Sequence, residues 1–330
     1  MNINLVYTKF EEYMVPQLVA LWNRDVYQSE IYAEFSEEDF KNRFLNNPNY
    51  SKDGTVAVMD NDKLVAFGCS AYHKQSDPQT SCGFITCLVV AKEYRRLGIG
   101  SKILKMLEDY IKSSGRNVIR NYFGAPMNLK WYIPGYDKHE HAGAPAVPFN
   151  TSYYFLLLAN GYNVNGQHDG FHVDLTKFKM SDEILEKIKE NEKDGYTITI
   201  YDPKVHYGFD EMFDALQNEG FRKTVHNVIS QPNPEPLLIC QKDGEILGFT
   251  GPIRTEASGR AYLAGVAIHP KAQKRGLGKT MFCTLCQKSK ENGAKFMTLF
   301  TGSDNRARNI YLYAGLRITQ SFVVMKKELK

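Results

Sequence analysis

Two stretches of this chain, LVVAKEYRRLGIG at residues 88–100 and VAIHPKAQKRGLG at residues 266–278, share one pattern of residues. In each, an apolar run leads into a polar turn that ends in G-x-G, so that Gly98 and Gly100 correspond to Gly276 and Gly278 at one constant offset. Self-similarity at a fixed offset indicates a duplicated structural unit. The chain is therefore predicted to contain two copies of one fold.

The repeat extends on both sides of the two turns. Helical spacing of apolar residues follows each turn, and each predicted helix ends at a glycine, Gly115 or Gly293, the residue that most readily takes the left-handed conformation there. Three strand-like segments precede each turn, and an apolar strand follows each helix. This order predicts an α+β fold in each half, with a mixed, mostly antiparallel twisted sheet flanked by helices.

The length of 330 residues also favours two domains, because one hydrophobic core rarely serves so long a chain. We interpret residues 1–176 as an N-terminal domain, 177–195 as a charged, partly helical linker and 196–330 as a C-terminal domain. The N-terminal half carries an insertion at about 123–150 that is rich in Pro, Gly and aromatic residues. Long loops of this kind are commonly functional, so the insertion is expected to line an acceptor pocket or a cleft.

Composition narrows the class of protein. The 41 basic and 37 acidic side chains leave a formal charge of only +4, which does not favour a nucleic-acid partner, and no apolar run is long enough for a membrane span. The six cysteines lie mostly in apolar runs, so we expect reduced thiols and a cytoplasmic protein. No metal is expected: Cys283 and Cys286 lack a second C-x-x-C, and His139 and His141 lack a spaced partner.

The glycine turns carry the chemistry. A glycine-rich turn at the start of a helix binds anions, because unpaired backbone N–H groups and the helix dipole converge there. A P-loop would need a glycine where Gln273 stands, and a dinucleotide fingerprint would follow the first strand of its domain, whereas these turns follow a meander. A phosphate-binding turn of another class is therefore indicated.

In both halves, the strand, the Q/R-x-x-G-x-G turn and the helix resemble motif A of the GCN5-related N-acetyltransferases. The resemblance implies that the turn binds the pyrophosphate of acetyl-CoA through backbone amides and that the preceding strand pairs with the pantetheine arm. In the C-terminal half it assigns these contacts to Val266, Ala267, Ile268, Gln273, Lys274, Arg275, Gly276, Leu277, Gly278 and Lys279. In the N-terminal half it assigns them to Leu88, Val89, Val90, Arg95, Arg96, Gly98, Ile99, Gly100 and Ser101. Asn305 is expected to hold a polar group of CoA or to cap the following helix.

The same resemblance predicts the proton donor. The family places a tyrosine four residues before a glycine, and DNRARNIYLYAGLR at residues 304–317 puts Tyr311 four residues before Gly315. Tyr311 is therefore predicted to be the general acid, with Tyr313 as the alternative. A core aromatic next to the sheet is the structural interpretation of either residue.

The N-terminal half differs at this point. Leu157 occupies the position four residues before Gly161, and a leucine cannot donate a proton. Tyr153 and Tyr154 lie about one turn earlier, so a displaced acid is one alternative. The simpler prediction is a catalytically weakened copy that still holds CoA, with the principal centre in the C-terminal half.

The predicted function is an acetyl-CoA-dependent N-acetyltransferase that acts on a primary amine of a small molecule or peptide, by direct attack in a ternary complex. The chain is expected to be a monomer or homodimer. Residues 260–268 contain neither a carboxylate nor a histidine, so the sequence identifies no general base. The rival hypothesis is a non-catalytic acyl-CoA-binding or interaction module, and a weaker one is a longer acyl or aminoacyl donor.

Overall fold

The computed structural model describes residues 4–26 and 31–329, and the chain forms two compact units. Unit 1 comprises residues 1–169 and 320–330, and unit 2 comprises residues 170–319. Both divisions fall inside long strands, β9 (Asn163–Asp174) and β16 (Arg317–Glu328), so each strand contributes a part to each unit. The division differs from the limits expected at 176 and 196, because pairing along these strands, rather than a charged segment, determines it.

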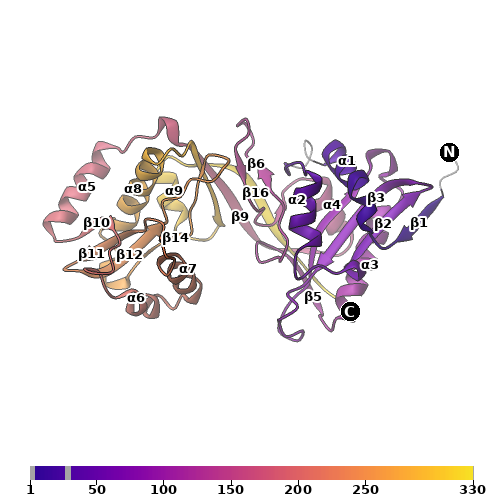
Figure 1. The fold of residues 1–330 in the computed structure, drawn as a ribbon, viewed down its shortest axis with the longest axis horizontal. Coiled ribbons are helices and arrows are strands. Elements are labelled where there is room, and N and C mark those ends of the chain that lie inside the picture. The colour runs from indigo at the N-terminus through magenta and orange to yellow at the C-terminus, as the bar shows by residue number, and fades with distance from the viewer. Residues whose placement is uncertain (1–3, 27–30, 330) are drawn as a thin grey trace. The chain divides into compact units, whose positions relative to one another are not determined.

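Unit 1 is built on an antiparallel sheet in the order β1 (Leu5–Thr8), β2 (Thr55–Asp60), β3 (Lys63–Ala71) and β4 (Phe84–Val90). Successive side chains of a strand point to opposite faces. On β3, Phe67 contacts Phe40 of α2 (Glu37–Phe40), whereas a Cβ on Gly68 would meet Ile103 of α3 (Ile99–Ser113). Helices α1 (Val15–Asp25) and α2 therefore cover one face and α3 the other (Figure 1).

The remainder of unit 1 follows α3. It comprises β5 (Val118–Asn121), the short strands β6 (Trp131–Tyr132), β7 (Glu140–His141) and β8 (Val147–Pro148), and helix α4 (Ser152–Ala159). The end of β16 pairs with β5, Met325 opposite Asn121, and with β8, Phe322 opposite Pro148. Phe322 and Met325 are fully buried in the core of unit 1. The last strand of the chain therefore completes the first unit.

Unit 2 repeats this architecture. Its elements are α5 (Asp182–Lys193), β10 (Thr197–Ile200), α6 (Phe209–Leu216), α7 (Glu219–Ile229), β11 (Leu238–Lys242), β12 (Glu245–Gly251), β13 (Arg260–Ala261), β14 (Gly265–Ile268), α8 (Leu277–Glu291), β15 (Phe296–Gly302) and α9 (Arg308–Tyr313). Its first sheet has the order β10-β11-β12-β14, and β13 pairs in parallel with β15. Phe249 of β12 contacts Phe213 of α6, and a Cβ on Gly248 would meet Met281 of α8. The predicted α+β fold of two similar domains is confirmed.

The constant offset of the sequence repeat persists in the backbone. Helices α3 and α8 both contain 15 residues, and both their first and their last residues are related by the same offset as the glycines of the turns. A short 3-10 turn precedes each glycine turn, at Lys92–Tyr94 and Pro270–Ala272. The repeat detected in the sequence is thus a repeat of three-dimensional structure.

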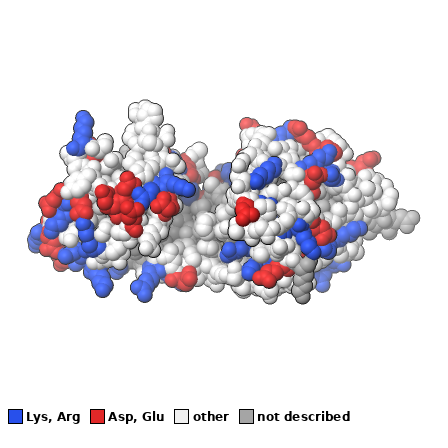
Figure 2. Space-filling model, turned by 90° about the horizontal axis from the view of Figure 1, so that it is seen from below, with Lys and Arg blue, Asp and Glu red and all other residues white. Residues whose placement is uncertain are grey.

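The charged segment at 177–195 contains helix α5, which packs on α8 within unit 2. Ser181 caps this helix, because its side chain accepts a hydrogen bond from the backbone N–H of Ile184 (3.3 Å). Acidic and basic side chains are interspersed over the face seen in Figure 2. No helix within residues 4–26 and 31–329 is long and apolar enough to cross a membrane.

Candidate active site

The site in unit 1 begins where two parallel strands separate. β4 and β5 are joined at a parallel bridge between Gly83 and Ile119, where the Gly83 N–H donates to the Val118 carbonyl (2.8 Å). In unit 2, β13 and β15 pair in parallel at Ala261 and Met297, which are the equivalents of Gly83 and Ile119 in the sequence repeat. Each unit therefore has the same junction before the strand that leads to its glycine turn. Beyond the junction in unit 1, a cavity of about 670 Å³ opens.

The two glycine turns have the same conformation. Arg96 and Gly98 have φ angles of 68° and 79°, and Lys274 and Gly276 have 65° and 76°. Gly98 and Gly276 are the N-caps of α3 and α8 and supply no capping side chain, so the first N–H groups of both helices remain available to an anion. The geometry fits the pyrophosphate of a CoA thioester.

The second glycine of each turn also lies against a helix. A Cβ on Gly100 would lie 3.2 Å from Leu156 of α4, and one on Gly278 would lie 2.9 Å from Ile310 of α9. These glycines allow the helix that follows the turn to approach the last helix of its half of the chain. Contact of these two glycines with a phosphate stays a prediction.

The side chains of Arg95 and Gln273 stabilise the turns by hydrogen bonds to the preceding strands. The Arg95 Nε donates to the Val90 carbonyl (3.0 Å), and the Gln273 Nε2 donates to the Ile268 carbonyl (3.1 Å). Both side chains thus turn back to the last residue of the preceding β4 or β14. Arg96 and Lys274 are exposed charged side chains within the two turns.

The two turns differ in what lies over them. A Cβ on Gly98 would meet nothing within 4 Å, whereas one on Gly276 would lie 3.3 Å from the Lys187 side chain of α5. Arg275 is also paired with Asp194, just beyond α5 (2.9 Å). The turn in unit 1 is therefore open, and the turn in unit 2 is partly covered by α5.

All nine residues expected to contact the cofactor in the N-terminal half line the unit 1 cavity: Leu88, Val89, Val90, Arg95, Arg96, Gly98, Ile99, Gly100 and Ser101. The structure brings them together on one wall that runs from the end of β4 to the start of α3. Asn160 near the end of α4 donates to the Ser101 Oγ (3.0 Å), which ties α4 to this wall. Their contact with a cofactor stays a prediction.

Next to this wall lies a hydrogen-bonded cluster from β4, β5 and α4. The Asn121 Nδ2 donates to the Ile85 carbonyl (2.8 Å) and to the Tyr153 hydroxyl oxygen (3.1 Å). The Tyr153 hydroxyl itself has the Ile85 carbonyl as a distant acceptor (3.4 Å). Burial raises the pKa of Tyr153 well above its usual value, so its proton is retained at neutral pH. Tyr153 is therefore a neutral donor on the cavity wall.

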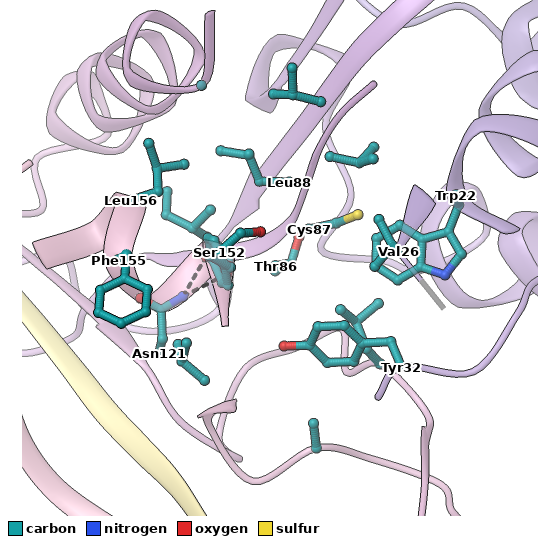
Figure 3. A pocket seen from close by; sticks show the side chains of 18 of the residues that line it. Trp22, Val26, Tyr32, Thr86, Cys87, Leu88, Asn121, Ser152, Phe155 and Leu156 are labelled. Carbon is teal, nitrogen blue, oxygen red and sulfur yellow. Dashed lines mark hydrogen bonds between the residues drawn. The ribbon is translucent and has the colours of Figure 1, made fainter. Parts of the chain in front are cut away.

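The opposite side of the cavity was not predicted. Figure 3 shows Trp22, Val26 and Tyr32 on the side facing Thr86 and Cys87 of β4, with Asn121, Ser152, Phe155 and Leu156 across the cavity. Trp22 and Tyr32 carry no sequence signal that distinguishes them from core aromatics. Asn121 carries one, because the alternation of β5 places this polar residue on the same buried face as Ile119.

The insertion at 123–150 supplies a wall of the same cavity. Its lining residues are Ala125, Met127, Asn128, Leu129, Ala144, Ala146 and Val147. Long-range hydrogen bonds hold it in place: Arg43 donates to the Asn128 carbonyl (2.6 Å), and Asn47 donates to the Pro126 carbonyl (2.9 Å). The lining residues among those described include no Asp, Glu or His, so no general base is identified.

In unit 2, Tyr311 lies on α9 and is only 6% exposed. Its ring packs against Phe171 (5.6 Å) and Phe282 (4.9 Å), and burial raises its pKa to about 12. None of the described residues hydrogen-bonds its hydroxyl. Leu299 is the equivalent of Asn121 in the sequence repeat, so the polar cluster of unit 1 has no counterpart here. The role of Tyr311 as general acid stays a prediction.

The other predicted residues of the second half lie around its turn and strand. Val266, Ala267 and Ile268 form β14 and are half-buried, and Leu277, Gly278 and Lys279 begin α8. The Lys279 ammonium lies 4.0 Å from the ring centre of Tyr313. Asn305 caps the turn before α9, because its Oδ1 accepts from the Ala307 N–H (2.9 Å). Among the described residues, no group of three or more His, Cys, Asp or Glu side chains forms a metal site.

Comparisons with known proteins agree with this geometry. The sequence profile of the acetyltransferase (GNAT) family matches residues 16–127 and 198–315, one match in each half. The chain belongs to the GNAT family. No curated protein sequence matches the chain. Each matched half of this GNAT protein therefore contains one glycine turn and one pair of parallel strands that separate before it.

Solved structures share the fold across the whole chain. A GCN5-related glucosamine N-acetyltransferase region of a fungal multi-domain β-N-acetylglucosaminidase has a TM-score of 0.67 and 12% identity, and covers 99% of this chain, which spans only 38% of the fungal one. A GCN5-related N-acetyltransferase from Sphaerobacter thermophilus has a TM-score of 0.62 at 15% identity, covering 98% and 95% of the two chains. A tandem GNAT protein from the clavulanic acid biosynthesis pathway has a TM-score of 0.59 at 13% identity, covering 98% of each chain. Identities this low establish the fold only.

Proposed function

We propose that the chain transfers an acetyl group from acetyl-CoA to a primary amine, and that the reaction takes place in the cavity of unit 1. One observation carries the proposal: a single cavity joins an open glycine turn, the separated end of β4 and the buried Asn121–Tyr153 pair. The equivalent turn in unit 2 is partly covered by α5, and no counterpart of Asn121 lies beside it. This proposal departs from the expectation that the C-terminal half is the principal centre.

Each part of the wall has a function in this proposal. The N–H groups after Gly98 bind the pyrophosphate, and Arg96 adds positive charge. Leu88, Val89 and Val90 lie where β4 has separated from β5, so those of their backbone groups that bond neither to β3 nor to Arg95 are available to the amides of the pantetheine arm. The thioester then lies between β4 and α4, next to Tyr153.

The transfer exchanges one bond for another. The amine nitrogen forms a bond to the acyl carbon, the carbon–sulfur bond breaks, and one proton passes in total from nitrogen to sulfur. The Tyr153 hydroxyl donates the proton to the departing thiolate and is reprotonated from the amine side. Asn121 positions this hydroxyl, because its Nδ2 occupies a lone pair of the phenolic oxygen and leaves the proton directed away from Asn121.

Acetyl-CoA binding to the turn is tested with matched glycine variants. Gly98 and Gly115 have φ angles of 79° and 83°, so alanine introduces similar backbone strain at both, but only Gly98 lies on the turn. In calorimetric titrations with acetyl-CoA, Gly98→Ala is expected to weaken binding at least about tenfold, because the added methyl group lies where the pyrophosphate approaches.

Gly115→Ala is the control and is expected to bind acetyl-CoA as the wild type does. Equal affinities of the two variants would contradict the assignment of the turn in unit 1. Gly276→Ala and Gly293→Ala form the same pair in unit 2, with φ angles of 76° and 84°, and they report whether a second site is occupied. Binding without transfer to any amine would favour the rival hypothesis of a non-catalytic acyl-CoA-binding module.

A further inference from the structure

The cavity in unit 1 has an apolar end beyond Tyr153, formed by aromatic and aliphatic side chains. Trp22 donates its indole N–H to the Ala33 carbonyl (3.0 Å), so the ring offers carbon surface to the cavity. The Tyr32 ring lies 5.8 Å from the Trp22 ring on the same side, next to Val26 (Figure 3). This side therefore offers mostly carbon surface, with the Tyr32 hydroxyl as its polar group.

A second apolar wall belongs to the insertion, which is hydrogen-bonded to the segment that carries Tyr32 through the Ala33 N–H and the Lys130 carbonyl (2.9 Å). Met127, Leu129 and Val147 line the cavity, and all three are at least nine-tenths buried. The hydrogen bonds from Arg43 and Asn47 to the backbone of the insertion hold this wall against the rest of unit 1. The apolar end is thus an enclosed part of the fold.

Charge is confined to the other end of the cavity. Of the described lining residues, only Arg95 and Arg96 are charged, and both lie at the glycine turn. A cationic group that is carried into the apolar end would lose its water, and the attraction of the Trp22 and Tyr32 rings for a cation would offset only part of that cost without a paired anion. A hydrocarbon group placed there would instead leave water for a surface of matching polarity.

We propose that the apolar end binds the body of the acceptor, and that the preferred acceptor carries one primary amine on an apolar chain or ring. This inference rests on the proposed acetyl transfer. The amine lies next to Tyr153, and the rest of the acceptor extends between Trp22, Tyr32 and the insertion. Substrates with a second ammonium at the far end are disfavoured.

Hexylamine and cadaverine test this inference, because they have the same length and differ only in a terminal methyl group or a second amine. The rates of thiol release from acetyl-CoA by the wild-type protein give kcat/KM for each amine. We expect the kcat/KM for hexylamine to exceed that for cadaverine at least about tenfold, because cadaverine would have to bury an unpaired ammonium. Equal values, or a preference for cadaverine, would overturn the inference and leave the proposed function intact.

A charge variant tests the same wall. Leu129→Asp places a carboxylate at the apolar end, and it is expected to shift the ratio of the two kcat/KM values toward cadaverine at least about tenfold. The control is Leu185→Asp, an exposed position on α5 in unit 2, which is expected to leave the ratio unchanged. An unchanged ratio in a folded Leu129→Asp protein would contradict the proposal.

Two other results have distinct meanings. If hexanoyl-CoA is preferred to acetyl-CoA while the two amines react equally, the apolar end binds the acyl chain and the inference is wrong. If neither amine, nor any amine of a wider set, releases thiol from acetyl-CoA, the proposed function fails and this inference fails with it. The wild-type comparison therefore separates the two claims.

Discussion

Tyr153 and Tyr311 lie on equivalent helices, but their surroundings differ. Tyr311 has the spacing to a following glycine that the family motif predicts, and in that register its ring packs against Phe171 and Phe282. Leu157 has the same spacing in unit 1 and is fully buried in the core. Tyr153 lies one turn earlier in α4 and lines the cavity. The proton donor that we propose for unit 1 is thus displaced along the helix.

The high pKa of Tyr153 predicts the pH dependence of transfer. Burial favours the neutral phenol, so Tyr153 stays protonated well above the usual tyrosine pKa of about 10. The kcat/KM for a primary alkylamine, whose pKa is about 10.4, should rise with pH up to about pH 10 as the amine loses its proton. A pH–rate profile checks this, and a falling limb near pH 8 would contradict Tyr153 as the acid.

At the residue scale, the sequence could predict only what local constraints determine. Gly98 and Gly276 need positive φ angles, a local requirement that the G-x-G pattern expresses. Trp22 and Tyr32 reach the cavity through long-range packing and look like ordinary core residues in the sequence. Asn121 was detectable as a polar residue that alternation places on the same face of β5 as Ile119, and its importance depends on the Tyr153 hydroxyl lying 3.1 Å from its Nδ2.

At the scale of elements, the order of strands and helices was predictable because each half repeats the same periodicities. The helices after the turns begin at Ile99 and Leu277 and end before Gly115 and Gly293, as the pattern predicts. The function of Gly100 and Gly278 was not predictable, since each depends on a contact with α4 or α9. In each G-x-G motif, the first glycine thus provides the backbone conformation and the second allows the helices to pack closely.

The insertion illustrates the same limit. The sequence indicates an insertion, because the first half is longer than the second between the turn and the last helix. Its place as a cavity wall depends on Arg43 and Asn47, which lie far earlier in the chain than the carbonyl groups they bind. Such contacts leave no periodic pattern in the sequence. The sequence therefore could not decide whether the insertion lines an acceptor pocket or a cleft.

At the scale of the whole molecule, the chain divides inside strands rather than at a linker. The run at 177–195 is charged because α5 is amphipathic and exposes one side, while Ile184 is buried. The end of β16 supplies core residues to unit 1, although it is the last strand of the chain. Pairing between segments so distant in sequence could not be predicted from composition.

A pair of variants on β16 tests this organisation. Met325 is fully buried in unit 1, whereas Ile318, on the part of the same strand that belongs to unit 2, is 40% exposed. Met325→Ala is expected to lower the free energy of unfolding of unit 1 by about 2–4 kcal/mol, because it leaves a cavity in the core. Ile318→Ala is expected to cost less than about 1 kcal/mol. Denaturant titrations followed by fluorescence measure both, and equal costs would contradict the assignment of this strand to the core of unit 1.

The central claim is that acetyl transfer takes place in unit 1 with Tyr153 as the proton donor, and steady-state transfer by tyrosine variants tests it most directly. Tyr153→Phe is expected to lower kcat about 100-fold while the acetyl-CoA dissociation constant stays within about twofold of wild type. Tyr154→Phe, at the neighbouring position of α4, and Tyr311→Phe are expected to retain nearly full turnover. A large loss of turnover in Tyr311→Phe with normal turnover in Tyr153→Phe would place the chemistry in unit 2 and contradict the claim.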